Sequence, residues 1–375
     1  MSSFKNWSDN RHDYAREWKK KTGGKVLGYF CTYLPEEILY AADVLPVRIF
    51  GQHGSDIGIS SAHIYDMYCP FSRSCLAEGL KGKYDYLDGV AIAQSCMHIR
   101  QAFWSWQKHL PVEYSYYIYM PHGVQSKGRY EYYRGELVEF KESLEKWLGR
   151  TISDADLDKG IDIVRKNKES MRKIWEFRKN DRPSITGLEA MEIVFSSQVT
   201  DKREHNEALE QLITELPDRK VDRETGTRLM IIGSEDDDRE FTKMVEEGLS
   251  LPATFVIEDH CVGSRYFWND FTPGEDRLAS IARWYLDRPP CPSKDWPKRL
   301  RFSHIKNLIQ EYKVEAAILM QQKFCDPHEL DIPALKTYLD ELDIPYYLIE
   351  FDVLVPAGQL KTRVEAFLET RVELV

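Results

Sequence analysis

The 375-residue chain lacks the long apolar segments and the excess of basic residues that would indicate binding to a membrane or to nucleic acid. No apolar run approaches the ~20 residues that a membrane helix needs, and residues 1–21 lack the apolar core of a signal peptide. The net charge of −10 argues against a nucleic-acid surface but leaves room for a local basic patch that meets an anionic ligand. We therefore expect a cytoplasmic protein that binds neither membrane nor nucleic acid.

Motifs of several common cofactor and nucleophile sites are also missing. No G-x-G-x-x-G opens a helix and no P-loop precedes Lys25, so neither a nicotinamide Rossmann site nor a Walker-type ATP site is supported. There is no G-x-S-x-G elbow, no H-E-x-x-H and no C-x-x-C pair, which argues against zinc ribbons and ferredoxin-type cysteine runs. The seven cysteines are odd in number and scattered, so a disulfide framework is not expected in a reducing cytoplasm.

The apolar patterns that are present predict an α/β protein with parallel sheets. Short apolar runs at 90–93 and 314–321 are typical of buried parallel strands. Residues 130–217 carry apolar side chains at three- and four-residue spacing, which predicts only helix there. A chain of this length suggests two domains. We predict four units: an N-terminal helix (1–24), a first α/β domain (25–129), a helical bridge (130–222) and a second α/β domain (223–375).

Single cysteines follow the predicted strands. Cys31, Cys96, Cys261 and Cys325 each come just after one, and Cys69 lies in a predicted loop. Because the carboxyl ends of parallel strands meet at one edge of a sheet, such thiolates can converge on one metal cluster. The spacing alone is a weak signal for a cluster and favours buried structural cysteines, which behave as small hydrophobic residues.

Blocks around three of the cysteines carry a resemblance to a known family. Y-C-P-F-S-R (68–73), Q-S-C-M-H (94–98) and K-F-C-D-P-H (323–328), with P-E-E-I-L-Y-A-A-D-V-L-P-V (35–47), resemble the 2-hydroxyacyl-CoA dehydratase and benzoyl-CoA reductase superfamily. The resemblance spans most of the chain, and the block at 323–328 is its most specific part. It implies two flavodoxin-like, Rossmann-like α/β domains with one [4Fe–4S] cluster between them.

Carried over block by block, the resemblance implies that Cys69, Cys96 and Cys325 are the cluster ligands. A fourth ligand stays open, with three candidates: Cys31, Cys75 and Cys261.

Within the superfamily, the chain looks most like the smaller of the two cluster-bearing subunits of ATP-dependent benzoyl-CoA reductase. Met97-His98 stands where the dehydratases commonly have an Asp or a similar residue after the central cysteine. The resemblance implies reduction of an aromatic acyl-CoA, benzoyl-CoA or a related aryl-CoA, to a cyclohexadiene carbonyl-CoA. It also implies partners: a larger homologous cluster-bearing subunit, an ATPase activator with its own cluster, and reduced ferredoxin as the electron donor. The alternatives are a 2-hydroxyacyl-CoA dehydratase subunit, a non-catalytic electron relay and a cluster-free α/β binding protein.

Ring reduction also needs a proton donor. His98 lies two residues past Cys96 and is the predicted catalytic residue, as a proton donor or as a hydrogen-bond donor to a cluster sulfide. A structural loop histidine is the alternative interpretation. His260 and His328 are weaker candidates for the same roles, and Arg73 and Arg100 are candidates for neutralising cluster or CoA charge.

Overall fold

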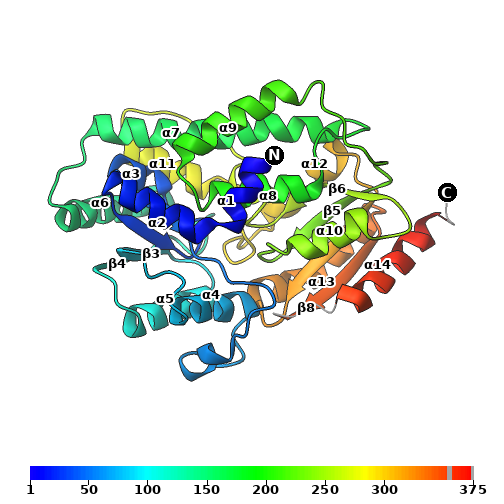
Figure 1. The fold of residues 1–375 in the computed structure, drawn as a ribbon, viewed down its shortest axis with the longest axis horizontal. Coiled ribbons are helices and arrows are strands. Elements are labelled where there is room, and N and C mark those ends of the chain that lie inside the picture. The colour runs from blue at the N-terminus through cyan, green and yellow to red at the C-terminus, as the bar shows by residue number, and fades with distance from the viewer. Residues whose placement is uncertain (353–356, 373–375) are drawn as a thin grey trace.

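Two four-stranded, all-parallel sheets organise the computed structural model, which describes residues 1–352 and 357–372 (Figure 1). The first sheet has the order β2-β1-β3-β4, with strands β1 (Val26–Tyr29), β2 (Leu45–Arg48), β3 (Gly89–Ala93) and β4 (Tyr114–Ile118). The second has the order β6-β5-β7-β8, with strands β5 (Thr227–Gly233), β6 (Ala253–Asp259), β7 (Ala316–Gln322) and β8 (Tyr346–Phe351). Both orders follow the doubly wound, flavodoxin-like pattern. The predicted α/β class with two parallel-sheet domains is confirmed.

The central strands are buried along their whole length. Every residue of β3 and of β7 is buried, as expected for parallel strands with helices on both faces of the sheet. Pairing aligns Leu27 with Gly89 in the first sheet and Leu229 with Ala316 in the second. β6 runs to Asp259, because its carboxyl end keeps pairing with β5.

Helices cover both sheets and form a layer across them (Figure 1). The helices up to the second sheet are α1 (Ser2–Asp9), α2 (Arg11–Thr22), α3 (Glu36–Ala41), α4 (Pro70–Leu80), α5 (Met97–His109), α6 (Arg129–Leu148), α7 (Asp154–Glu176), α8 (Gly187–Ser197) and α9 (Lys202–Glu215). Those that follow are α10 (Arg239–Glu247), α11 (Arg277–Leu286), α12 (Leu300–Glu311), α13 (Asp326–Glu341) and α14 (Ala357–Val372). Short 3₁₀ helices are η1 (Gly58–Ala62), η2 (Phe177–Lys179) and η3 (Ser264–Tyr266).

The predicted helical stretch 130–217 forms α6 to α9, and it ties the two sheets together. In Figure 1, α7 and α9 run along one side of the molecule beside both halves of the chain. α7 packs against α3 and α9, and α8 packs against α1. Ser153 caps α7 in a reciprocal capping box with Asp156, as its side-chain chemistry predicts.

Some helix boundaries differ from the sequence prediction. The N-terminal segment forms two helices that join at Asn10, and α2 ends at Gly23, whose φ of +68° is the left-handed conformation that glycine favours. α11 was not predicted; it packs against α6 and shares the hydrophobic core of the first sheet. The domain boundaries at 25, 130 and 223 stay predictions.

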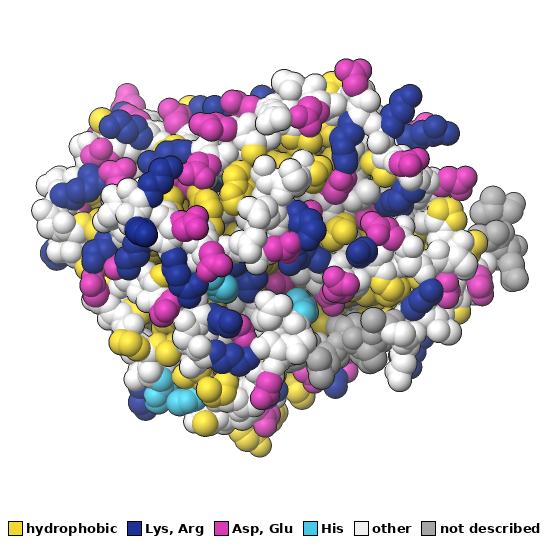
Figure 2. Space-filling view, in the orientation of Figure 1, with side chains coloured by type: hydrophobic (Ala, Val, Ile, Leu, Met, Phe, Trp, Pro, Cys, Tyr) yellow, Lys and Arg dark blue, Asp and Glu magenta, His cyan; other side chains and the backbone are white. Residues whose placement is uncertain are grey.

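Acidic and basic side chains are interspersed over the face seen in Figure 2. None of the helices in the described residues combines the length and the apolarity that a membrane span requires.

Candidate functional site

The carboxyl ends of both sheets deliver cysteines to one place. In each sheet the strand order reverses between the first and third strands, β1 and β3 or β5 and β7, and such switch points form the crevice where ligands bind. Cys31 follows β1, Cys96 follows β3 and Cys325 follows β7. The predicted convergence at strand ends therefore joins thiols of both sheets: Cys31 and Cys96 from the first and Cys325 from the second.

These loops enclose a cavity of about 80 Å³. Six of the seven cysteines line it: Cys31, Cys69, Cys96, Cys261, Cys291 and Cys325. Phe30, Phe71 and Ile99 contribute apolar walls. We call this space the cysteine cavity.

The three predicted ligands share a local geometry that the sequence analysis missed. Cys69 is the N-cap of α4, Cys96 the N-cap of α5 and Cys325 the N-cap of α13. A helix N-terminus carries unpaired backbone N–H groups and a partial positive charge, which favour a nearby thiolate. Three helices thus direct their positive ends at the cysteine cavity.

A proline signal was available for two of these helix starts. Proline is favoured in the first helical turn, and Pro70 and Pro327 follow the Cys69 and Cys325 caps by one and two positions. Cysteine itself is not a typical N-cap residue, so the caps were overlooked. These caps place the start of α5 at Met97 and the start of α13 at Asp326.

Burial controls the protonation of the three thiols. It raises the pKa of Cys69, and it raises the pKa values of Cys96 and Cys325 well above the ordinary thiol value. Their thiolate forms therefore need a strongly positive ligand, which a metal provides. Among the described residues, no three His, Cys, Asp or Glu side chains form a group that could hold a single metal ion. Thiolates are the usual ligands of iron–sulfur clusters, so cysteines that line one cavity are a donor set of the kind such a cluster uses.

His98 connects two of the cysteine-bearing helix starts. Its Nδ1 accepts a hydrogen bond of 3.0 Å from the backbone N–H of Cys69, and its Nε2 lies 3.3 Å from a carboxylate oxygen of Asp326. Burial lowers the pKa of His98, against the opposing charges of Asp326 and Glu329. The neutral ring that accepts at Nδ1 can donate its Nε2 hydrogen to Asp326. His98 does not line the cysteine cavity, and its role as a proton donor stays a prediction.

The other candidates divide between the cavity and its surroundings. His328 lines the cysteine cavity, whereas His260 does not, and burial lowers the pKa of His260 to about 3. Cys75 is buried in α4 with its sulfur 3.4 Å from the carbonyl oxygen of Ile49, and it does not reach the cavity. Arg73 forms an ion pair with Asp66, 2.8 Å away.

An open cleft of about 680 Å³ leads to the cysteine cavity. The two spaces share four lining residues: Ser95, Cys96, Ser293 and Pro327. Arg100 and Arg299 line the cleft together with the exposed apolar side chains of Met97, Trp296 and Leu330. Asp295 and Asp326 line the cleft as well, and Arg299 is held by an ion pair with Asp331, 2.9 Å away. An anionic group that approaches Cys96 from outside would therefore meet Arg100.

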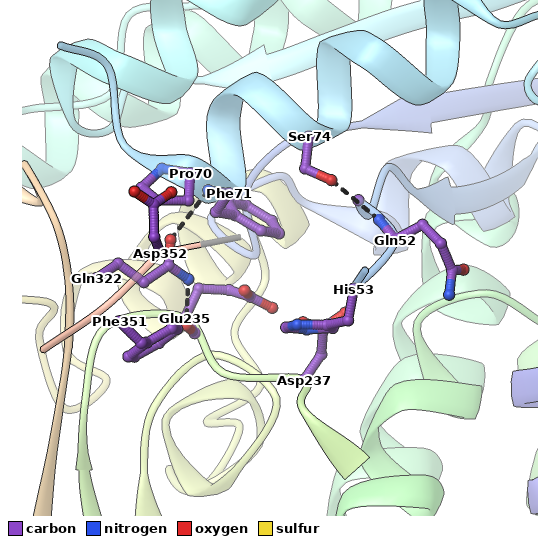
Figure 3. A pocket seen from close by; sticks show the side chains of 11 residues that line it. Gln52, His53, Pro70, Phe71, Ser74, Glu235, Asp237, Gln322, Phe351 and Asp352 are labelled. Atoms are coloured by element: carbon purple, nitrogen blue, oxygen red, sulfur yellow. Dashed lines mark hydrogen bonds and ion pairs between the residues drawn. The ribbon is translucent and has the colours of Figure 1, made fainter. Parts of the chain in front are cut away.

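A second, smaller pocket shares Phe71, Glu235 and Gln322 with the cysteine cavity. Figure 3 shows the side chains that line it. His53 faces Asp237 there, with the ring Nε2 2.5 Å from a carboxylate oxygen. Burial alone would lower the pKa of His53, but the charge of Asp237 raises it to about 10. Glu235 lines both this pocket and the cysteine cavity, and burial together with the charge of Asp237 raises its pKa well above the usual range.

Gln322 holds this wall of the site together. Its side chain accepts a hydrogen bond from the backbone N–H of Phe71 and donates one to the backbone carbonyl of Glu235, so it joins α4 to the loop after β5 (Figure 3). The two halves of the chain are thus fixed to each other beside the cavity.

Comparisons with known proteins identify a family and several relatives of this chain. The family model for the 2-hydroxyglutaryl-CoA dehydratase D-component matches residues 31–370. The chain is 26% identical to the (R)-phenyllactyl-CoA dehydratase beta subunit of Clostridium sporogenes, over 99% of this chain and 98% of that protein. It is 25% identical to a benzoyl-CoA reductase subunit of Thauera aromatica, over 92% and 90%. It is 26% identical to the (R)-2-hydroxyglutaryl-CoA dehydratase beta subunit of Acidaminococcus fermentans, over 94% and 93%.

Proposed function

The chain belongs to the family of the 2-hydroxyglutaryl-CoA dehydratase D-component, and from this premise we propose that it is the iron–sulfur subunit of an enzyme acting on an acyl-CoA. The resemblance that the cysteine blocks carried is thereby confirmed at the level of the superfamily. The relatives named above are subunits of dehydratases and of a reductase, so a partner subunit is part of the proposal.

The proposed cofactor is a [4Fe–4S] cluster held by Cys69, Cys96 and Cys325. One observation carries this proposal: the three thiols, each at the start of a helix, line one buried cavity. Thiolates are the usual ligands of iron–sulfur clusters, and the helix N-termini stabilise the negative charge of such a group. When bound, the cluster supplies low-potential electrons to the substrate.

The chain's own residues prepare the site for that chemistry. Apolar side chains such as Phe30 and Ile99 supply apolar walls beside the cysteines. Arg100 can attract the phosphate groups of a CoA thioester into the cleft. His98 positions the loops of Cys69 and Cys325, and we retain it as the proposed proton donor.

For the substrate, we propose an aromatic acyl-CoA, whose ring takes up electrons and protons in equal number to give a cyclohexadiene carbonyl-CoA. Support comes from the benzoyl-CoA reductase relative and from Met97-His98 after the central cysteine. The proposed partners are a larger homologous cluster-bearing subunit and an ATPase activator with its own cluster, which passes on electrons from reduced ferredoxin.

A 2-hydroxyacyl-CoA dehydratase subunit is the second candidate, because the relatives from Clostridium sporogenes and Acidaminococcus fermentans are named as dehydratase subunits. That reaction removes water from the acyl group and needs no net reduction, since the electron that starts it is recovered at the end. The two candidates therefore differ in whether product forms at the expense of stoichiometric reductant.

The experiment starts from the full chain, coexpressed with its genomic neighbours and purified without oxygen. About four iron atoms and about four sulfides per chain, lost after Cys69→Ala, Cys96→Ala or Cys325→Ala, are expected. The loaded complex is then assayed with benzoyl-CoA and with a 2-hydroxyacyl-CoA, with reductant consumption followed in both. Folded, iron-free protein from such a preparation would refute the cluster, and turnover of the hydroxyacyl substrate alone would refute the ring reduction.

A further inference from the structure

Three cysteines of the cavity remain without a role when Cys69, Cys96 and Cys325 are assigned. They are Cys31 after β1, Cys261 after β6 and Cys291 in the loop after α11. A single fourth ligand would use one of them and leave two unexplained. Cys291 was not considered from the sequence, because it follows a helix that was not predicted and lies in a proline-rich stretch, Pro289-Pro290-Cys291-Pro292.

The six thiols separate into two groups by their electrostatic neighbours. Cys325 interacts with Cys69 and Cys96, and acidic side chains, Glu235 and Asp326, act on Cys69. Cys261 interacts with Cys291 and Cys31, and its surroundings are basic. Cys291 also acts on Cys96 and Cys325, so the two groups are adjacent parts of one site.

Four buried cations surround the second group. The exposed fractions are 2% for Arg48, 2% for Arg265, 6% for Arg288 and 0% for Lys294. Arg265 acts on Cys261 and Cys291, Arg288 on Cys31 and Cys261, and Lys294 on Cys31 and Cys291. Arg48 donates a hydrogen bond to the backbone carbonyl of Cys261, as does Gln198, which fixes that loop.

Two of these cations, Arg288 and Lys294, have no ion-pair partner within the described residues, whereas Arg48 lies 3.7 Å from Glu235 and Arg265 lies 3.5 Å from Asp259. Arg288 donates to the carbonyl and hydroxyl oxygens of Thr32, and Lys294 donates to the carbonyl of Pro121. Within the described residues, no carboxylate forms an ion pair with either side chain. The Nε atoms of Arg48, Arg265 and Arg288 and the Nη1 atom of Arg265 are buried without a hydrogen-bond partner in the same part of the chain.

Burying a cation without a compensating negative charge is strongly unfavourable, and buried N–H donors without acceptors add to the cost. A set of metal-bound thiolates and inorganic sulfides would satisfy both demands, because it brings negative charge and sulfur acceptors. Neutral structural thiols would satisfy neither.

We propose that Cys31, Cys261 and Cys291 form a second ligand triad, which holds a second iron–sulfur unit beside the one assigned to Cys69, Cys96 and Cys325. Arg48, Arg265, Arg288 and Lys294 balance its charge. The first iron–sulfur unit is part of the proposed function, and the inference depends on the proposed function in that respect alone. The evidence for the second triad is its own three thiols and the four cations around them.

Iron and acid-labile sulfide per chain test the proposal in full-length protein assembled and purified without oxygen. The wild-type chain is expected to hold about eight iron atoms, twice the about four of one cubane. Cys31→Ser, Cys261→Ser and Cys291→Ser should each lower this content by about half. Cys75→Ser is the matched control, since its thiol is buried outside the cavity, and it should keep the wild-type content.

Each other outcome identifies what fails. About four irons in the wild type, kept in all three variants, overturns the second triad and leaves the first intact. Loss of iron in only one of the three variants reduces the triad to a single fourth ligand and also overturns it. A wild-type chain without iron refutes both the inference and the proposed function.

If the cysteine variants do not fold, the second triad can be tested by removing one of the buried positive charges beside it. Lys294→Gln retains a hydrogen-bonding side chain but removes one positive charge beside Cys31 and Cys291. The midpoint potential of the iron–sulfur signals in reductive titrations should become more negative, because the reduced form loses a compensating charge. An unchanged potential would overturn the proposed role of the cations.

Discussion

The histidine between two cysteine loops offers a sharp test of the site, through the change His98→Ala. This change removes the acceptor of the Cys69 backbone N–H, which is buried, and the link to Asp326. Leaving a buried donor unsatisfied costs about 1–3 kcal/mol. We therefore expect the free energy of unfolding to fall by about that amount, together with easier loss of iron to a chelator.

His98→Asn is the matched control. Its amide oxygen can occupy about the position of the imidazole Nδ1 and accept the same hydrogen bond from Cys69, while the contact with Asp326 is lost. Urea denaturation of the full chain without oxygen should give His98→Asn a stability closer to wild type than to His98→Ala. Equal destabilisation in both variants would refute the argument from the Cys69 hydrogen bond.

The same pair separates positioning from proton transfer. If His98 donates a proton, His98→Asn should keep the wild-type iron content but lose turnover, because an amide cannot replace the ring as an acid at neutral pH. If His98 only positions Cys69, the Asn variant should recover most of the turnover that the Ala variant loses. Iron content and turnover measured on the same preparations distinguish the two roles.

Three further predictions concern stability. Gly160→Ala in α7 should lower the free energy of unfolding by about 1–3 kcal/mol, because the new Cβ would overlap the backbone of α3. Gly135→Ala in α6 has open space around it and should raise the free energy of unfolding by up to about 1 kcal/mol. Urea denaturation compares the two variants. Lys202→Met should cost about 3–5 kcal/mol by leaving Glu36 buried without its 2.8 Å ion-pair partner, and a loss below about 1 kcal/mol in thermal unfolding would contradict this. Burial lowers the pKa of His205 from 6.5 to about 3 in the folded chain. As the pH drops below 6.5, His205 therefore binds a proton in the unfolded chain but not in the folded one, and the free energy of unfolding falls. Between pH 7 and pH 5 the wild type should lose about 2 kcal/mol more than His205→Gln, as measured by denaturation at each pH.

The strands and their cysteines could be predicted because the signals are local. The run Val90 to Ala93 is apolar on every residue, which a strand buried on both faces requires, and Cys96 follows it at a short fixed distance. The order of parallel strands then makes the carboxyl ends converge. Sequence reasoning thus predicted which thiols lie near one another. The family resemblance implied a cluster between two domains, but the residue pattern alone did not predict that the two sheets face each other across the cavity.

The cations of the site could not be predicted in the same way. Lys294 follows a stretch rich in proline and reads as a surface residue, yet it is fully buried because α11 and its following loop pack onto the first sheet's core. Arg48 ends a four-residue strand and is buried by contacts with Glu235 and Gln198, which lie far away in the chain. Burial of a charge is decided by such distant contacts, and no local pattern encodes it.

The contrast between the two thiol groups follows from these same contacts. Cys69, Cys96 and Cys325 have helix N-termini as their positive partners, which supply partial charges that are part of the backbone. Cys31 and Cys261 start no helix, and their positive partners are Arg48, Arg265 and Arg288, which carry full charges. Full charges confined in an apolar interior need an anion more strongly than helix ends do. The second group therefore makes the greater demand for a negatively charged occupant, which the proposed second iron–sulfur unit would supply.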